Sequence, residues 1–490
     1  MAERKRSGNG RKRAARAKPA ASFDGAVGDG TGASQPAPGT TGRYLVLMRE
    51  GETKAGTRAL EDVGLSIASS AEFSTRGVSA EDLSSAKAMV FEELGVAVVD
   101  SPPEEIRELG VSAAEDGPIL AIEPERIVFA LEVIDSPIGL LPTPIAVPFV
   151  GPPQTLPAPA TPARPTGTFS AEYLRGYHDA VVNLARNMLG DGLESPITEE
   201  GVPSVAAETD LTWGLQVTRV SASRFSGRGI RVAVLDTGLD LGHPDFTGRA
   251  IQSRSFIPGQ PVQDGHGHGT HCIGTACGPR QPSRLPRYGI AFGSEIFAGK
   301  VLSNGGSGSD SGIIAGIEWA MRNRCAIVSM SLGAPVAPGT GHSRIFEQVA
   351  RRALSAGTLI IAAAGNDSNR PSSIAPVSHP ANCPSIMAVG ALDSSIRVAA
   401  FSNGGLNPQG GQVDIAGPGV AIISSWPRPV LYRSISGTSM ATPHVAGIAA
   451  LFAESDRNLR GRALASMLMQ SARRLFLSAR DVGAGLVQAP

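Results

Sequence analysis

Two polar segments far apart in the chain carry residue types used in nucleophilic catalysis. Asp236-Thr237-Gly238 directly follows the apolar run 230–235, and Ser439 lies in SGTSMATPHVAG, where a helix is predicted to begin. Pro443 is expected in the first turn of that helix. A serine hydroxyl is a weak nucleophile until a base removes its proton, and a carboxylate must orient that base. A histidine between these segments would complete such a site.

The segment DGHGHGTH, residues 264–271, contains three of the eight histidines in the chain. Its HxHxxH spacing can place imidazoles around a zinc ion. Alternatively, His268 acts as a single general base and its neighbours are structural. A metal hydrolase would need further ligands downstream, and the Asp expected before the third histidine is replaced by Thr270. The sequence therefore favours His268 as a base acting between Asp236 and Ser439.

The segments VAVLDTGLDLGHPD, GHGHGTHCIGT and SGTSMATPHVAG resemble, in order and separation, the catalytic signatures of subtilisin-family serine proteases. Matching stretches run from Trp213 to Leu486. The resemblance implies a doubly wound α/β fold with a mostly parallel sheet. It also implies a serine endopeptidase that hydrolyses proteins through an acyl-enzyme, with Asp236 as orienting carboxylate, His268 as base and Ser439 as nucleophile. A protease-like binding scaffold without turnover is the alternative, and the presence of every catalytic position argues against it.

Further stretches resemble the parts of the family site that bind substrate. AAAGN, residues 362–366, resembles the oxyanion segment, which implies that the Asn366 amide and the Ser439 backbone N–H stabilise the tetrahedral oxyanion. Two other stretches resemble the strands that hold an extended peptide by β-augmentation. Their residues are Ser331, Leu332, Gly333, Gly306, Ser307 and Gly308.

The resemblance implies that catalysis needs no cofactor. Asp245 matches a carboxylate that helps to hold a structural calcium ion in many relatives, although the loop 277–288 does not resemble the family's calcium loop. Asp264 and Asp367 flank the site and are candidates for favouring basic substrate side chains. Cys272 follows the histidine segment and is interpreted as a small buried hydrophobic residue.

The elements that must position these residues alternate along the chain after residue 213. Strand-like runs lie at 230–235, 327–330, 358–363 and 386–389, and helical segments lie at 311–323 and 343–354. This alternation predicts a largely parallel sheet with helices on both faces. Functional groups gather at the carboxyl ends of strands in such sheets, where Asp236 lies. Residues 209–490 are therefore expected to form the protease domain.

Residues 43–131 are predicted to form a small α+β plait, which we call the plait. Strands are expected at 44–48 and 90–99, a helix at 57–63, a second helix capped by Ser101 and Glu104, and a hairpin of 118–122 with 126–131. The closing run ILAIEPERIVFAL resembles the end of subtilisin propeptides. This implies a proenzyme whose own propeptide binds in cis as an inhibitor and folding aid.

Two segments lack a globular pattern. Residues 1–42 begin with eight Lys or Arg in the first twenty positions and are expected to be a solvated basic tail. The whole chain balances 44 Lys and Arg with 44 Asp and Glu, so no nucleic-acid partner is expected. Residues 132–208 are expected to be a linker, with ten prolines in 137–165 and one amphipathic helix at 170–189. Protein or peptide substrates and the propeptide are the expected partners of a monomer.

Compartment signals are weak in this sequence. No apolar stretch of a standard secretory signal follows the basic start, and the longest apolar run, 358–364, is too short to span a membrane. The four cysteines form neither a CxxC pair nor a disulfide-dense pattern. These observations favour a cytoplasmic over a secreted enzyme. They leave the processing site and the side-chain preference open.

Overall fold

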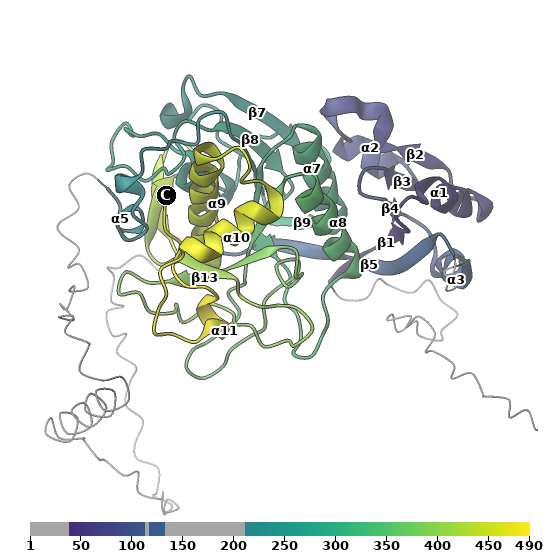
Figure 1. The fold of residues 1–490 in the computed structure, drawn as a ribbon. Helices are drawn as coiled ribbons and strands as arrows, with labels where there is room; N and C mark the ends of the chain where they lie inside the picture. Colours follow the sequence, from purple (N-terminus) through teal and green to yellow (C-terminus); the bar gives the residue numbers. More distant parts are fainter. Residues whose placement is uncertain (1–38, 113–116, 133–210) are drawn as a thin grey trace, which may run out of the picture. The chain divides into compact units, whose positions relative to one another are not determined.

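The computed structural model describes residues 39–112, 117–132 and 211–490 (Figure 1). Seven strands form a central sheet between residues 231 and 418, and every pairing in it is parallel. In spatial order they are β14 (Ile415–Pro418), β13 (Met387–Leu392), β12 (Leu359–Ala363), β10 (Ile327–Met330), β6 (Arg231–Asp236), β8 (Glu295–Lys300) and β7 (Ile251–Ser255). The expected parallel sheet is confirmed.

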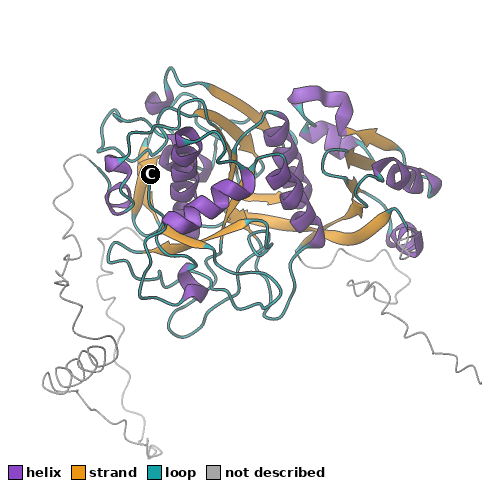
Figure 2. Ribbon diagram, viewed as in Figure 1, coloured by secondary structure: helices purple, strands orange, loops and turns teal. Residues whose placement is uncertain are grey.

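Helices and short strands surround this sheet (Figure 2). The helices are α5 (Trp213–Val217), α6 (His268–Cys277), α7 (Asp310–Arg322), α8 (Arg344–Ser355), α9 (Thr438–Ser455), α10 (Gly461–Ser471) and α11 (Ala479–Val482), with 3₁₀ turns η2 (Val220–Ala222) and η3 (Pro244–Phe246). The short strands are β9 (Ser307–Ser309), β11 (Leu332–Gly333) and the antiparallel pair β15 (Ile422–Ser425) and β16 (Tyr432–Ile435). Both α7 and α8 begin and end within one residue of the helices predicted at 311–323 and 343–354.

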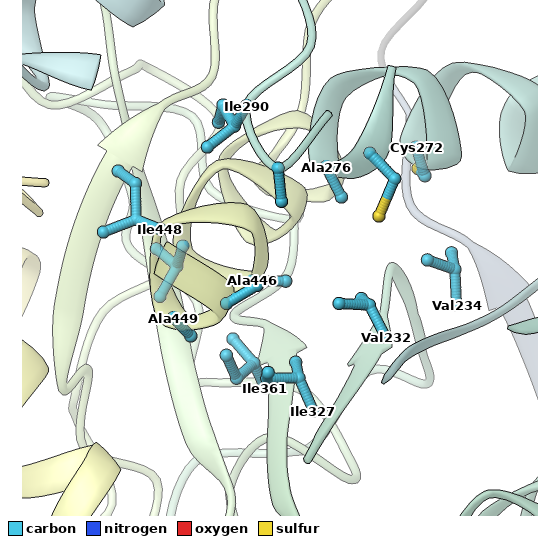
Figure 3. Close-up of a cluster of buried hydrophobic side chains, with 14 of the residues drawn as sticks. Val232, Val234, Cys272, Ala276, Ile290, Ile327, Ile361, Ala446, Ile448 and Ala449 are labelled. Atoms are coloured by element: carbon cyan, nitrogen blue, oxygen red, sulfur yellow. The ribbon is translucent and has the colours of Figure 1, made fainter. Parts of the chain in front are cut away.

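The inner strands of the central sheet are buried on both faces, which explains why they are mostly apolar, whereas the edge strand β7 is polar and partly exposed. Val232 and Val234 of β6 pack in one core with residues of α6 and α9 (Figure 3). Ala233 and Leu235 point to the opposite face and pack with residues of α7 and α8. Successive strand residues alternate between faces, so a strand covered on both sides needs no polar positions. The doubly wound α/β fold is confirmed.

The plait has its own sheet and its own core. Its strands are β1 (Thr40–Met48), β2 (Ile67–Ser69), β3 (Ala88–Phe91), β4 (Val96–Val99) and β5 (Ile119–Ala130), and its helices are α1 (Thr53–Asp62), the 3₁₀ helix η1 (Ser70–Arg76), α2 (Ala80–Ser85) and α3 (Pro103–Ser112). On one face, Val46 and Met48 pack with Leu60 of α1 and Ile106 of α3. The alternate strand residues belong to a cluster that also contains residues of α7 and α8. The plait sheet therefore packs between its own helices and the protease helices.

Three local predictions in the plait are wrong. The expected single strand at 90–99 is the hairpin of β3 and β4, which turns at Gly95 with φ of +54°. The expected hairpin at 118–131 is instead the single strand β5. Ser101 donates its hydroxyl hydrogen bond to Glu105 and not to Glu104. In β5, Glu123 and Glu125 lie two residues apart on one face and accept hydrogen bonds from distant helices, so the segment stays extended.

β5 joins the plait to the rest of the described chain. Residues 119–126 pair with β1, whereas residues 127–130 pair with β9 and β11 (Figure 1). The plait and residues 211–490 belong to one compact unit. β1 begins at Thr40, inside the segment expected to be a basic tail, while the rest of that tail, the prolines of the linker and the predicted helix at 170–189 lie outside the described residues. No helix among the described residues has the length and hydrophobicity needed to cross a membrane.

Candidate active site

The fold brings three of the predicted residues to the carboxyl edge of the central sheet. Asp236 ends β6, His268 begins α6, and Ser439 lies in the first turn of α9. His268 Nδ1 lies 2.8 Å from Asp236 Oδ1, and both side chains are buried. The backbone N–H of Thr237 donates to the same carboxylate oxygen at 2.7 Å. This pair fixes the imidazole with Nε2 as its remaining functional atom.

The electrostatics of this pair decide when His268 can accept a proton. Burial alone would lower the pKa of His268, but the adjacent Asp236 carboxylate dominates and raises that pKa well above its ordinary value. The imidazolium formed after proton abstraction is thereby stabilised. The arrangement suits a strong general base.

Asp264 holds the loop that positions His268 and is not a substrate-facing carboxylate. It is 3% exposed and accepts five hydrogen bonds, two of them from Thr270 and one from the Thr237 hydroxyl. Burial would raise the pKa of Asp264, but hydrogen bonds led by that from the Gly267 backbone lower it. The prediction that Asp264 favours basic substrates is wrong, because its oxygens are engaged inside the loop.

Ser439 does not point its hydroxyl at His268 in this state. Its Oγ donates to the backbone oxygen of Ser331 at 3.1 Å. Within the described residues, His268 Nε2 is buried and has no hydrogen-bond partner. Hydrogen bonds between nucleophile and base are often unformed outside the reacting complex. A Ser439 hydroxyl acting as nucleophile would first have to rotate toward Nε2.

Pro443 shapes the backbone next to the nucleophile. It lies inside α9, not in its first turn as expected. Proline has no N–H to donate four residues back, which frees the carbonyl of Ser439 for other donors. That oxygen accepts from Ser331 Oγ at 2.8 Å and from Cys272 Sγ at 3.6 Å. Burial raises the pKa of Cys272 to about 11, so this cysteine remains a thiol.

Asn366 carries an amide aimed into the site. Its Nδ2 donates to the carbonyl oxygen of Leu131 at 2.8 Å. Its Oδ1 accepts from the backbone N–H and the hydroxyl of Thr438 at 2.9 and 2.8 Å, which fixes the orientation of the amide. The sequence reasoning missed Thr438, although this residue directly precedes the predicted nucleophile. The geometry provides a donor for a developing oxyanion.

The end of β5 lies between the two predicted substrate strands. Val128 pairs with Gly308 of β9, and Ala130 pairs with Leu332 of β11. The Ala130 backbone N–H donates to the Gly306 oxygen at 2.9 Å. The remaining predicted residues, Ser307, Ser331 and Gly333, also pair with or accept a hydrogen bond from residues 129–131. All six residues thus contact one extended peptide strand.

The histidine segment does not form a zinc site. His271 Nε2 lies 2.9 Å from the Ile422 oxygen, away from the Asp236 pair, and burial lowers the pKa of His271 to about 3. Among the described residues, the only grouping with metal-ligand spacing is Asp236, His268 and Cys272. Two of its three members, Asp236 and His268, already contact each other at 2.8 Å. This geometry favours the general-base interpretation over a zinc site built from the three histidines.

Asp245 does not fit a calcium ligand. Its Oδ1 accepts from the Ser283 backbone N–H at 2.9 Å, and its Oδ2 accepts from the hydroxyls of Tyr288 and Tyr432 at 2.6 and 3.0 Å. Calcium requires several oxygen acceptors around one point, whereas these neighbours present hydrogens to the carboxylate. The hydrogen-bond donors around Asp245 therefore do not support the prediction that this residue is a calcium ligand.

Comparisons with known proteins agree with this geometry. A sequence model of the subtilase family matches residues 227–485. The chain belongs to the subtilase family. Subtilisin Savinase of Lederbergia lenta is 39% identical over 283 residues, which are 57% of this chain and 97% of that protein. The alkaline protease of Alkalihalobacillus alcalophilus is 38% identical over 295 residues, covering 59% of this chain and 72% of that protein.

A solved structure agrees with the sequence relatives. Sphericase matches with a TM-score of 0.51 and 30% identity, covering 58% of this chain and 100% of sphericase. This subtilase is therefore a serine endopeptidase of the subtilisin type that acts on proteins. Its subtilisin homologues need no catalytic cofactor. The fold, enzyme class and reaction expected from the sequence are confirmed.

The expected compartment is wrong. The related proteins are secreted, extracellular subtilisins, and this kinship points away from the cytoplasm. The sequence argument relied on the lack of a recognisable apolar secretory signal. Similarity to these relatives across the whole protease domain is stronger evidence about the compartment than a short signal that was not recognised.

Proposed function

We propose that Ser439 is the nucleophile, His268 the general base and Asp236 the carboxylate that orients it. His268 Nε2 takes the Ser439 proton as Oγ attacks the substrate carbonyl, and the Asn366 amide and Ser439 N–H bind the oxyanion. His268 then protonates the leaving amine, and a water molecule releases the acyl group by the same steps in reverse. The observation that carries this proposal is the Leu131 carbonyl, held by Asn366 Nδ2 at 2.8 Å at the end of a bound peptide strand.

The pH profile tests the role of His268. Only neutral imidazole accepts a proton, and the Asp236 carboxylate holds the pKa of His268 above its ordinary value despite burial. Activity should therefore fall as pH decreases through this raised pKa, which places the acid limb above about pH 6.5 and the optimum at neutral to alkaline pH. The measurement is kcat against pH with a saturating peptide anilide. Maximal activity near pH 4 would instead indicate a carboxylate base.

We propose that residues 331–333 and 306–308 bind the substrate backbone before the cleaved bond. Their pairing with residues 127–131 supports this role, because a substrate in the same register would make the same backbone hydrogen bonds. Residues 209–490 would then form the protease domain, and residues 132–208 the linker to residues 43–131. We expect a monomer without a nucleic-acid partner.

We propose that residues 43–131 are an inhibitory propeptide that binds in cis. Glu123 Oε1 accepts from the backbone N–H of Arg344 at 2.8 Å, at the start of α8. Glu125 Oε1 accepts from the backbone N–H of Ser311 at 2.9 Å, in the first turn of α7. Helix N-termini carry unsatisfied N–H groups and a partial positive charge. One strand thus stabilises the starts of two protease helices.

Glu125 is the more strongly held of the two carboxylates. It is fully buried, and Arg43 Nε lies 2.7 Å from its Oε2. Arg43 also donates to the Ser311 hydroxyl at 2.8 Å. The buried Glu125 carboxylate is held by Arg43 of the plait and by the start of α7, so it needs partners on both sides of the interface between the plait and the protease. Such contacts link folding of the protease helices to binding of the plait, and β5 then blocks the substrate strands.

The plait added in trans should inhibit the protease. We expect residues 43–131 to inhibit the separate protease domain, and deletion of these residues to lower the yield of active enzyme. Glu125→Ala should raise the inhibition constant about tenfold or more, because a hydrogen bond to a charged group contributes about 1.5–3 kcal/mol. Glu104→Ala, at an exposed position on α3, is the matched control. Absence of inhibition at micromolar concentration would refute the propeptide role while leaving the triad intact.

We propose that hydrogen bonds, not calcium, hold the segment around Asp245. Tyr288→Phe removes a buried donor to Asp245 and should destabilise the protein by about 1–3 kcal/mol. EDTA should leave the Tm and the activity of the wild type unchanged. Thermal unfolding with EDTA and with added calcium measures both effects. A calcium-dependent rise in Tm that Asp245→Ala abolishes would show that Asp245 is a calcium ligand.

A further inference from the structure

Large apolar side chains are exposed on α10 and on the loop that leads to α11 (Figure 1). Phe476 is 111% exposed, so its ring extends from the loop into solvent, and Met469 and Leu477 are exposed beside it in the sequence. Isolated exposed apolar residues are common, whereas several together mark a binding surface. We call this surface the α10–α11 face, and it consists of Arg462, Met469, Arg473, Arg474, Phe476 and Leu477.

A groove lies next to the exposed ring, between α10 and α11. Its volume is about 600 Å³, and its lining includes Met469, Leu475, Leu477 and Val482. Arg474 is the charged residue in this lining. The face therefore combines a protruding aromatic ring with a largely apolar hollow that has one cationic side.

The apolar residues of the face are surrounded by arginines. Residues 457–480 contain six arginines and no Asp or Glu, in a chain that has no net charge. Arg462, Arg473 and Arg474 are exposed and form no ion pair with another residue that the structure describes. Asp481, which follows this stretch, already accepts hydrogen bonds from two arginine side chains. The positive charge of the face is therefore uncompensated, and it attracts anionic partners.

The α10–α11 face lies away from the candidate active site. A second hollow shares Ser466 and Met469 with the groove, and it is lined by Leu359 and Met387, the first residues of β12 and β13. These residues mark the amino edge of the parallel sheet, whereas Asp236 ends β6 at the carboxyl edge. A partner bound to the face therefore leaves the substrate strands accessible.

Shape and charge together decide which partner fits. A second copy of this chain has a groove for Phe476, but a two-fold axis through the face would bring Arg473 and Arg474 of both copies together. An acidic protein would need a pocket that encloses the protruding ring. A lipid bilayer surrounds an inserted ring without a matching shape, and anionic headgroups pair with the arginines. The observations favour an anionic bilayer.

We propose that the α10–α11 face binds the surface of anionic phospholipid bilayers, with Phe476 and Leu477 inserted among the lipids and the arginines on the headgroup phosphates. Each arginine near such a surface strengthens binding about fivefold, and burial of the ring adds about tenfold or more. Salt screens the arginines, so binding weakens as ionic strength rises. The carboxyl edge of the sheet, with Ser439, stays open to protein substrates.

Vesicle sedimentation tests the surface. The full-length Ser439→Ala chain, which cannot form an acyl-enzyme during the assay, should bind mixed phosphatidylcholine and phosphatidylglycerol vesicles at least about tenfold more strongly than phosphatidylcholine alone. Phe476→Ser and the double variant Arg473→Gln with Arg474→Gln should each lower the partition coefficient about tenfold. Equal partition into both kinds of vesicle would overturn the proposal, and so would unchanged partition of Phe476→Ser.

Two control variants match these substitutions. Val430→Ser removes an exposed apolar side chain and Arg228→Gln removes an exposed arginine, both outside the α10–α11 face, and both should leave partition unchanged. The basic residues 1–20 are present in every variant and contribute equally to all of them. With Ser439 restored, Phe476→Ser should hydrolyse a soluble peptide as fast as wild type, which shows that its fold is intact.

Fluorescence tests insertion of the ring. Phe476→Trp adds an exposed tryptophan to a chain whose three tryptophans are each at most 8% exposed. Its emission should shift to shorter wavelength on the mixed vesicles and should be quenched by brominated acyl chains. An equal shift on soluble polyglutamate, without quenching on vesicles, would indicate an acidic protein partner. A lipid-free dimer that Phe476→Ser dissociates would indicate a second copy, and either result would overturn the bilayer assignment.

Discussion

Ser439→Ala is expected to abolish nearly all peptide hydrolysis. The alanine cannot form the acyl-enzyme, so only binding and the oxyanion donors remain to accelerate direct attack by water. The expected loss in kcat is on the order of 10⁶-fold, a magnitude taken from measurements on subtilisin and not from the present geometry. A fluorogenic peptide assay at high enzyme concentration measures it, with Ser355→Ala on the exposed side of α8 as the matched control.

The same prediction extends to the base and its carboxylate. His268 and Ser439 act as one unit, so His268→Ala should be about as severe and the double variant little worse than either single one. Asp236→Asn keeps the shape but favours the wrong tautomer of His268, with an expected loss of about 10⁴-fold. Full activity in any of these variants would refute the serine mechanism. Loss of wild-type activity to EDTA with recovery on zinc would do the same.

The central sheet and the positions of Asp236, His268 and Ser439 at the ends of its elements were predictable because their signals are local. A strand buried on both faces requires a continuous apolar run, and Asp236 directly follows such a run in β6. The segments around His268 and Ser439 each include the helix start that holds the functional side chain. Local sequence therefore predicted both the elements and the residues at their ends.

The errors arise where a distant partner decides the local structure. Glu123-Pro124-Glu125 has the composition of a turn, yet Glu125 bonds to Ser311, 186 residues later, and the chain stays extended. Asp264 resembles a carboxylate on the rim of a site, but the chain folds back over it and five donors enclose it. Composition near a residue cannot report such partners.

Asn366→Ala is expected to lower kcat by about 10²- to 10³-fold, a range established for an oxyanion donor in subtilisin. The Nδ2 of Asn366 donates to the bound Leu131 carbonyl at 2.8 Å, and this donor becomes more valuable as the oxygen gains negative charge. KM should change little, because the backbone pairing that binds the substrate remains intact. Steady-state kinetics on one peptide separate the two parameters.

Two comparison variants make this prediction specific to the amide. Thr438→Val removes the hydroxyl that donates to Asn366 Oδ1 at 2.8 Å but leaves the backbone donor at 2.9 Å, so its loss in kcat should be smaller than that of Asn366→Ala. Asn407 is a buried asparagine that accepts from the Gly339 N–H at 2.7 Å, and Asn407→Ala should lower stability with little change in kcat. If Asn366→Ala raised KM and left kcat intact, the amide would bind the ground state and the oxyanion role would be wrong. The expected order of kcat is therefore wild type and Asn407→Ala, then Thr438→Val, then Asn366→Ala, because each step removes more control over the Asn366 amide that donates to the Leu131 carbonyl.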